Sequence, residues 1–142
     1  MGNICRSPAA ECLFRVAVEE AGKGEQFEIE SAGTGGWHAG DDPDHRMQLA
    51  AKQQGMCIEG SARQITQKDI ESFDWIFCMD QDNYDSVIAM GGDPNKTKLF
   101  LPYVGQEHLR EVPDPYYGGD KGFEDVIALI NEAVKILATM LG

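Results

Sequence analysis

The chain has 142 residues, with 24 acidic side chains against 12 lysines and arginines, so its formal net charge at pH 7 is −12. This length predicts one domain, 1–142, with a single core, and 42% hydrophobic residues argue against disorder. The acidic balance excludes nucleic acid and anionic membrane surfaces as expected partners, because both bind basic patches. Four scattered cysteines, with no Cys-x₂-Cys pair and no apolar run of membrane length, predict free thiols, no metal site and a cytoplasmic location.

The first half of the chain alternates helix and strand signals. Apolar residues at helical spacing predict a helix over 7–21. The segment Gln26–Ser31 alternates polar and apolar residues, which predicts a half-buried or edge strand. A glycine-rich loop over 32–36 follows, and Pro43 then opens a second predicted helix that runs to about residue 54.

The second half continues the alternation. A third helix is predicted from Thr66, where Asp69 completes the pattern of a capping box. The uninterrupted apolar run Trp75–Met79 predicts a strand buried on both faces. A short helix over 83–90, a strand over 98–101 and a long amphipathic helix from Phe123 follow. Together these elements predict a doubly wound α/β fold with a parallel sheet.

The segment Gly2–Ser7 has the composition of a phosphate-binding loop that leads into a helix. Gly2 permits close backbone approach, and Arg6 can hold two phosphate oxygens at once. Ser7 is expected to cap the helix and Pro8 to take its first position. Backbone N–H groups and the positive end of the helix would add to the attraction for a phosphate dianion.

Asp114 stands between Pro113 and Pro115, on a stretch that the two proline rings keep stiff and non-helical. Such a stretch suits a carboxyl group that must be presented at a fixed point as a general acid. Taken alone, the same three residues are also typical of a turn before a helix.

Trp37 lies on the glycine-rich loop, where an aromatic side chain forms either a wall for a flat ligand or a local packing anchor. We favour the wall. We expect His38 to hydrogen-bond within the loop, and His45 and His108 to be surface residues.

These motifs resemble the low-molecular-weight protein tyrosine phosphatases, whose signature reads Cys-x-Gly-Asn-x-Cys-Arg-Ser. Gly2–Ser7 match its last six positions, and Asp114–Tyr117 match the family's Asp-Pro-Tyr-Tyr motif. The resemblance implies a flavodoxin-like, four-stranded parallel sheet in the order 2-1-3-4, with helices on both faces. It also implies a monomer that releases inorganic phosphate from phosphotyrosine proteins or small aryl phosphates, without metal or cofactor.

The resemblance also implies residue roles. Arg6 would stabilise the transferred phosphoryl group and Asp114 would protonate the leaving phenolate. Asp80 would support the loop, and Arg63 would form a structural salt bridge. The implied phosphate and substrate contacts are Gly2, Asn3, Ile4, Cys5, Ser7, Trp37 and Tyr116.

The family's nucleophilic cysteine would stand directly ahead of Met1, so we expect the given chain to lack both that thiol and the first strand. Cys57 has an arginine at the required spacing, but no Ser-Pro helix start follows it, and Cys5 is expected on the far side of the arginine turn. We therefore expect residues 1–142 alone to be inactive. A non-catalytic phosphate or phosphotyrosine binder and an inactive fragment remain the alternatives.

Overall fold

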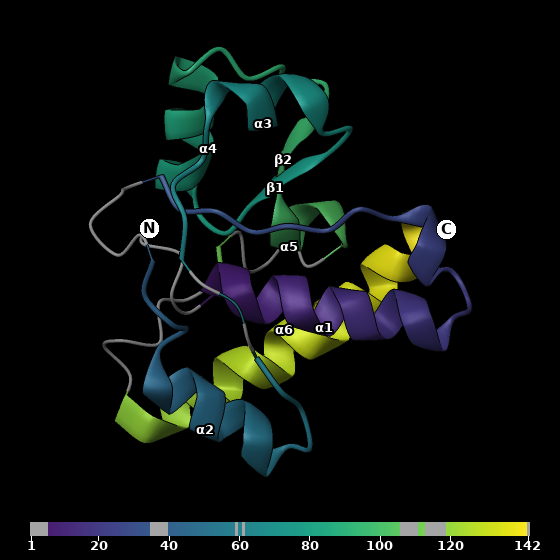
Figure 1. The fold of residues 1–142 in the computed structure, drawn as a ribbon, viewed down its shortest axis with the longest axis vertical. Helices are drawn as coiled ribbons and strands as arrows, with labels where there is room; N and C mark the ends of the chain where they lie inside the picture. The colour runs from purple at the N-terminus through teal and green to yellow at the C-terminus, as the bar shows by residue number, and fades with distance from the viewer. Residues whose placement is uncertain are drawn as a thin grey trace.

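The computed structural model describes residues 6–34, 40–58, 60, 62–105, 111, 112 and 119–141 (Figure 1). The helices are α1 (Arg6–Glu20), α2 (His45–Gln53), α3 (Gln67–Ser72), α4 (Gln81–Ala89), α5 (Phe100–Tyr103) and α6 (Gly119–Leu141). The strands are β1 (Ile76–Cys78) and β2 (Thr97–Leu99), and a 3-10 turn, η1, covers Gly24–Gln26.

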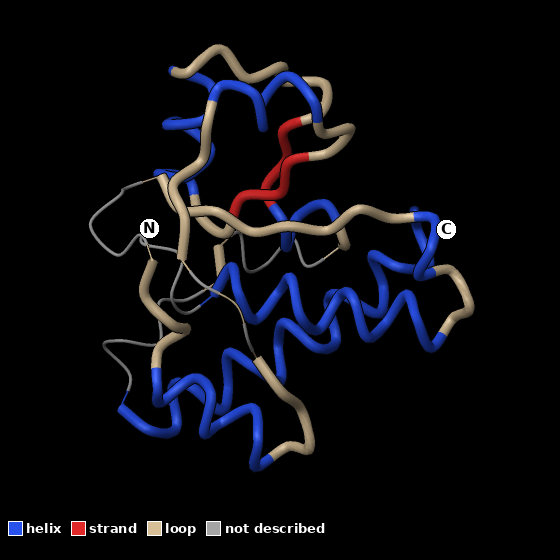
Figure 2. Tube along the Cα trace, viewed as in Figure 1, coloured by secondary structure: helices blue, strands red, loops and turns tan. Residues whose placement is uncertain are grey.

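The two strands form a parallel pair in which Phe77 lies opposite Lys98 (Figure 2). Helix α4 connects them, as expected for a parallel crossover. Ile70 of α3 and Val87 of α4 form a small buried cluster with Cys78 of β1. The parallel α/β arrangement predicted from the sequence is therefore confirmed, and a strand lies within the apolar run Trp75–Met79. It is not buried on both faces as predicted, because Ile76 and Phe77 are half-buried and Trp75, just before the strand, is exposed.

The larger core lies below the sheet, where α1 and α6 run side by side and α2 packs against α6 (Figure 1). Helix α6 buries one face along its length, which confirms the predicted amphipathic helix. The buried residues of that face are Phe123, Val126, Ile127, Ile130, Ala133, Val134, Leu137 and Ala138. In the described part of the chain, no helix, α6 included, combines the length and apolar character needed to cross a membrane.

Side-chain caps fix where several helices begin. The Thr66 hydroxyl accepts from Asp69 N at 3.2 Å, and the Asp69 carboxylate accepts from Thr66 N at 2.8 Å, so the predicted capping box is present. Helix α2 begins at His45 rather than Pro43, because the carboxylate of Asp44 caps it by accepting from the backbone N–H groups of residues 46 and 47.

The predicted strand over Gln26–Ser31 is wrong: its first residue ends the η1 turn and residues 27–32 are loop. A strand exists only where a neighbour supplies its hydrogen bonds. Here a cavity separates the loop from β1, and pairing begins only at an isolated parallel bridge between Gly33 and Gln64.

The second predicted strand, over 98–101, is shifted. It covers Thr97–Leu99, and Phe100 already begins α5. Pro102 lies in the single turn of α5 and has no N–H to donate to a sheet ladder, which explains why the strand stops early.

Candidate functional site

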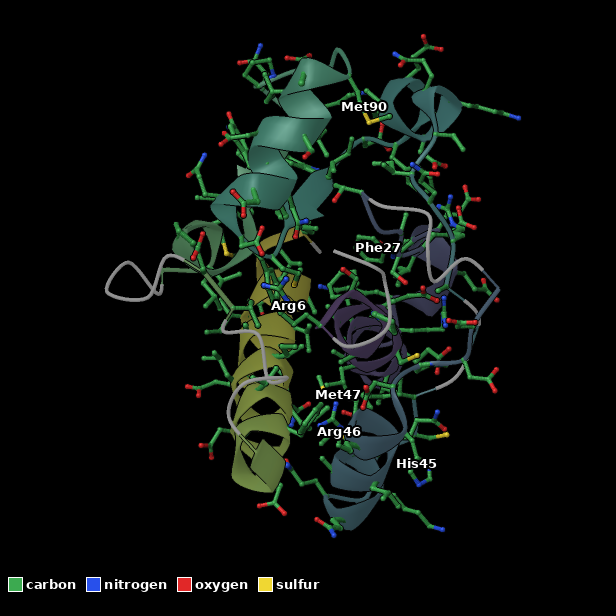
Figure 3. The ribbon with its side chains drawn as sticks, turned by 90° about the vertical axis from the view of Figure 1, so that its left-hand side faces the viewer. Arg6, Phe27, His45, Arg46, Met47 and Met90 are labelled. Atoms are coloured by element: carbon green, nitrogen blue, oxygen red, sulfur yellow. The ribbon has the colours of Figure 1, made fainter. Side chains whose placement is uncertain are left out.

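Arg6 is the first residue of α1, and its side chain is 7% exposed. Its Nη2 lies 2.9 Å from Asp80 Oδ2, and its Nη1 donates to the carbonyl oxygen of Val112 at 2.9 Å. Figure 3 shows Arg6 in the middle of the molecule, where the sheet and α4 meet α1 and α6. A buried guanidinium needs anionic or carbonyl partners, and these two contacts fix both of its terminal nitrogens.

Asp80 follows β1 and performs two tasks with its two carboxylate oxygens. Oδ1 accepts from Asn83 N at 2.8 Å and thereby caps α4, while Oδ2 pairs with Arg6. The expectation that Asp80 supports the site at the carboxyl end of its strand is consistent with this geometry. The position of Arg6 is thus set by where β1 ends.

Val112 joins a third segment to the same point. Its side chain is buried, its N–H donates to Met79 O at 2.8 Å, and its carbonyl accepts from Arg6. The neighbouring Glu111 carboxylate accepts from Gln81 N at 2.8 Å. The chain that leads to Asp114 is therefore anchored to the guanidinium two residues earlier. The sequence did not predict that Val112 and Glu111 contribute to the site. Their position just before Pro113 is the one sequence feature that connects them with it.

The structure tests few of the predicted site residues directly. Ser7 is half-buried in the first turn of α1 and is not its N-cap. Pro8 takes the third helical position rather than the first, because α1 begins at Arg6, two residues before the start expected at Pro8. The predicted residues outside the described part of the chain are Gly2, Asn3, Ile4, Cys5, Trp37, Asp114 and Tyr116.

Arg63 forms the salt bridge expected of it. Its Nη1 lies 2.8 Å from Asp69 Oδ2, and its Nη2 lies 3.6 Å from Glu30 Oε2. Burial acts to raise the pKa of Asp69, but the hydrogen bonds from Arg63 and Thr66 outweigh it and lower that pKa below its ordinary value. This network connects α3 to the 27–32 loop. It shares no residue with the contacts that Arg6 makes to Asp80 and Val112.

The described cysteines differ in their accessibility. Cys12 and Cys78 are buried, and Cys57 is exposed. Burial, with a smaller contribution from the charge of Asp80, raises the pKa of the Cys78 thiol to about 12, so this thiol stays protonated at neutral pH. Within the described residues, no group of three or more His, Cys, Asp or Glu side chains is arranged to hold a metal ion.

The fold and the site define a class: an α/β protein with a parallel sheet that carries a fixed arginine at the carboxyl end of a strand. Ligands of open α/β sheets bind at this end of the strands. A model of the family described as low molecular weight phosphotyrosine protein phosphatase matches residues 1–142. The chain belongs to this family, whose members are protein-tyrosine phosphatases that hydrolyse phosphotyrosine.

Similar proteins support this assignment. The low molecular weight protein-tyrosine-phosphatase YfkJ of Bacillus subtilis is 41% identical in an alignment of 133 positions that covers 92% of this chain and 84% of that protein. The human low molecular weight phosphotyrosine protein phosphatase is 37% identical in an alignment of 129 positions that covers 89% of this chain and 82% of that protein. The solved protein tyrosine phosphatase of Entamoeba histolytica superposes with a TM-score of 0.92 at 35% identity, covering 99% of this chain and 92% of that one.

Proposed function

We propose that the site around Arg6 binds the phosphoryl group of protein phosphotyrosine and of small aryl phosphates. The observation that carries this proposal is the buried guanidinium, held by Asp80 on one nitrogen and by the Val112 carbonyl on the other. A guanidinium of fixed orientation presents its remaining N–H donors as a rigid fork, which matches two oxygens of a phosphate.

The phosphate-binding loop would be completed by residues that the family signature matches. Gly2, Asn3, Ile4 and Cys5 would surround the phosphoryl oxygens with backbone N–H groups, and Ser7 would donate to the sulfur of the nucleophile. Trp37 and Tyr116 would flank the aromatic ring of the substrate. These assignments rest on the matched motifs.

The reaction would run in two steps. A thiolate attacks phosphorus, a sulfur–phosphorus bond forms, the ester bond breaks, and Asp114 gives its proton to the departing phenolate. Water then attacks phosphorus, the sulfur–phosphorus bond breaks, and the proton of that water passes to Asp114. Arg6 and the loop amides stabilise the charge on the equatorial oxygens in both steps. The products are the phenol and inorganic phosphate.

The proposal assigns the thiolate to a cysteine directly ahead of Met1, where the signature places it. Cys78 does not suit the role, because its burial keeps the thiol protonated. We also propose that the protein works as a cytoplasmic monomer without metal or cofactor.

The experiment compares residues 1–142 with a longer form in which about ten residues, an apolar stretch ending in cysteine, precede Met1. We expect the longer form to hydrolyse para-nitrophenyl phosphate and a phosphotyrosine peptide with sensitivity to vanadate. A matched form that ends in serine instead of cysteine should bind vanadate but show background turnover. A folded, cysteine-containing form that neither binds vanadate nor turns over substrate would overturn the proposal.

A further inference from the structure

The segment Glu111–Val112 is held against the carboxyl end of β1 through both of its residues. Val112 N donates to Met79 O at 2.8 Å, and the Val112 side chain is buried in the larger core. The Glu111 carboxylate is exposed, and its Oε2 accepts from Gln81 N at 2.8 Å. Glu111 therefore supplies a side-chain bond that a substitution can remove, whereas the bonds of Val112 come from its backbone.

The N–H that binds Glu111 belongs to the first residue of α4. An N–H in the first turn of a helix has no partner within the helix, and the positive end of the helix dipole attracts a carboxylate. Asp80 already caps this helix end by accepting from Asn83 N, so α4 has a cap without Glu111. The bond from Gln81 N to Glu111 therefore fixes the incoming segment more than it fixes the helix.

These contacts close a ring with Arg6. Arg6 binds Asp80 through Nη2 and the Val112 carbonyl through Nη1, each at 2.9 Å. Asp80 is followed in the chain by Gln81, whose N–H binds Glu111, and Glu111 is followed by Val112. Because Glu111 closes the ring, its loss would leave Val112 as the attachment that the described residues provide. The segment could then turn about Val112.

Asp114 stands two residues after Val112 in the sequence, and Pro113 separates them. Two residues of chain span at most roughly 7 Å between Cα atoms. A proline fixes its own φ and restricts the residue before it to extended conformations, so few rotations remain between the anchored Val112 and Asp114. A turn of the anchor is therefore passed on to the carboxyl group rather than absorbed by the chain.

We propose that Glu111 is a positioning residue for the general acid of the reaction. Its bond to the first N–H of α4 sets the orientation of the segment that presents Asp114 to the leaving group beside Arg6. This inference rests on the proposed role of Asp114 as proton donor, and it adds that a carboxylate outside the matched motifs determines how well that donor works. Misplacing a catalytic group by about 1 Å can cost on the order of 100-fold in rate.

The test measures kcat/KM of the cysteine-containing form on aryl phosphates whose leaving groups differ in basicity. A departing phenolate needs a proton, whereas 2,4-dinitrophenolate leaves without one. Glu111→Ala should lower kcat/KM at least about tenfold for phenyl phosphate and at most about twofold for 2,4-dinitrophenyl phosphate. Glu111→Gln keeps an oxygen that can accept from Gln81 N, so it should show a smaller loss with the same selectivity.

Two further variants serve as controls. Asp82→Asn removes a negative charge from an exposed residue in the first turn of α4, and should keep kcat/KM for both substrates within about twofold of the unaltered form because solvent screens that charge. Asp114→Asn should cause the same selective loss to a larger extent. Adding Glu111→Ala to Asp114→Asn should cause no further selective loss, because the proton donor is already gone.

Several results would overturn the role of Glu111 while leaving Asp114 as the acid. These are equal losses on both substrates in Glu111→Ala, additive selective losses in the double variant, and an equal selective loss in Asp82→Asn. An Asp114→Asn variant without selective loss would instead refute the proposed acid, and the role of Glu111 would fall with it. If Glu111→Ala does not fold, the selectivity of Glu111→Gln decides in its place.

Discussion

Arg6 and Asp80 pair at 2.9 Å, and this contact joins the first residue of α1 to the residue that caps α4. The pair is mostly shielded, with the two side chains 7% and 17% exposed. One carboxylate therefore holds a helix start and orients the cation that we assign to phosphate binding.

Asp80→Asn should separate these two tasks. Asparagine is a good N-cap, so α4 keeps its cap, but the charge that opposes Arg6 is lost. Removing one partner of a buried ion pair costs about 3–5 kcal/mol of unfolding free energy when nothing replaces it. We expect the lower end of this range, because the amide oxygen of the new asparagine can still accept a hydrogen bond from Arg6. Urea unfolding measures this cost, and vanadate affinity of the cysteine-containing form should fall at least about tenfold.

Asp82→Asn provides the matched control, since Asp82 is an exposed residue of the same helix. It should change the free energy of unfolding by no more than about 0.5 kcal/mol. Equal effects of the Asp80 and Asp82 substitutions would contradict the role given to Asp80.

The capping box of α3 should contribute measurably to the free energy of unfolding. Thr66→Ala removes the hydroxyl that accepts from Asp69 N and should cost about 1 kcal/mol. Thr139→Ala is the control, because the Thr139 hydroxyl only donates to Lys135 O on the exposed side of α6. Thermal unfolding of the two variants should therefore differ, with the lower midpoint for the Thr66 variant.

Acid should weaken the Arg63–Asp69 network. The folded pKa of Asp69 lies below its ordinary value, so the group contributes stability above the unfolded pKa, about 4, and loses it as pH falls through the folded pKa. Asp69→Asn should remove this contribution to the pH dependence. Urea unfolding at pH 7 and near pH 3 gives the loss of unfolding free energy on acidification. The same loss in the variant as in the unaltered chain would contradict the role of Asp69.

The described thiols should react in a fixed order. Cys57 is exposed and should be alkylated by iodoacetamide at pH 8 within the native protein, whereas Cys78 should react only after unfolding because burial raises its pKa to about 12. Mass mapping of the modified peptides distinguishes them. Rapid native labelling of Cys78 would show that the β1 region opens easily.

The sequence predicted what depends on local patterns. The capping box at Thr66 and the presence of a strand within Trp75–Met79 are set by neighbouring residues, and both are confirmed. The burial of that strand on both faces was predicted wrongly, because only Cys78 of its three residues is buried. Gln26–Ser31 has a strand pattern but forms no strand, because pairing depends on a neighbour that local alternation does not reveal. The carbonyl of Val112 became part of the site through its backbone position, which no side-chain motif predicts.

We assign phosphoryl binding to Arg6, which Asp80 and Val112 hold in place. The most direct test is a crystal structure of the cysteine-containing form with tungstate, a phosphate analogue located by its anomalous scattering. We expect tungstate oxygens within hydrogen-bond distance, about 3 Å, of the Arg6 guanidinium, with the Asp80 and Val112 contacts retained. Tungstate bound away from Arg6, or an Arg6 side chain that leaves both partners to reach it, would contradict phosphoryl binding by an arginine held in this orientation.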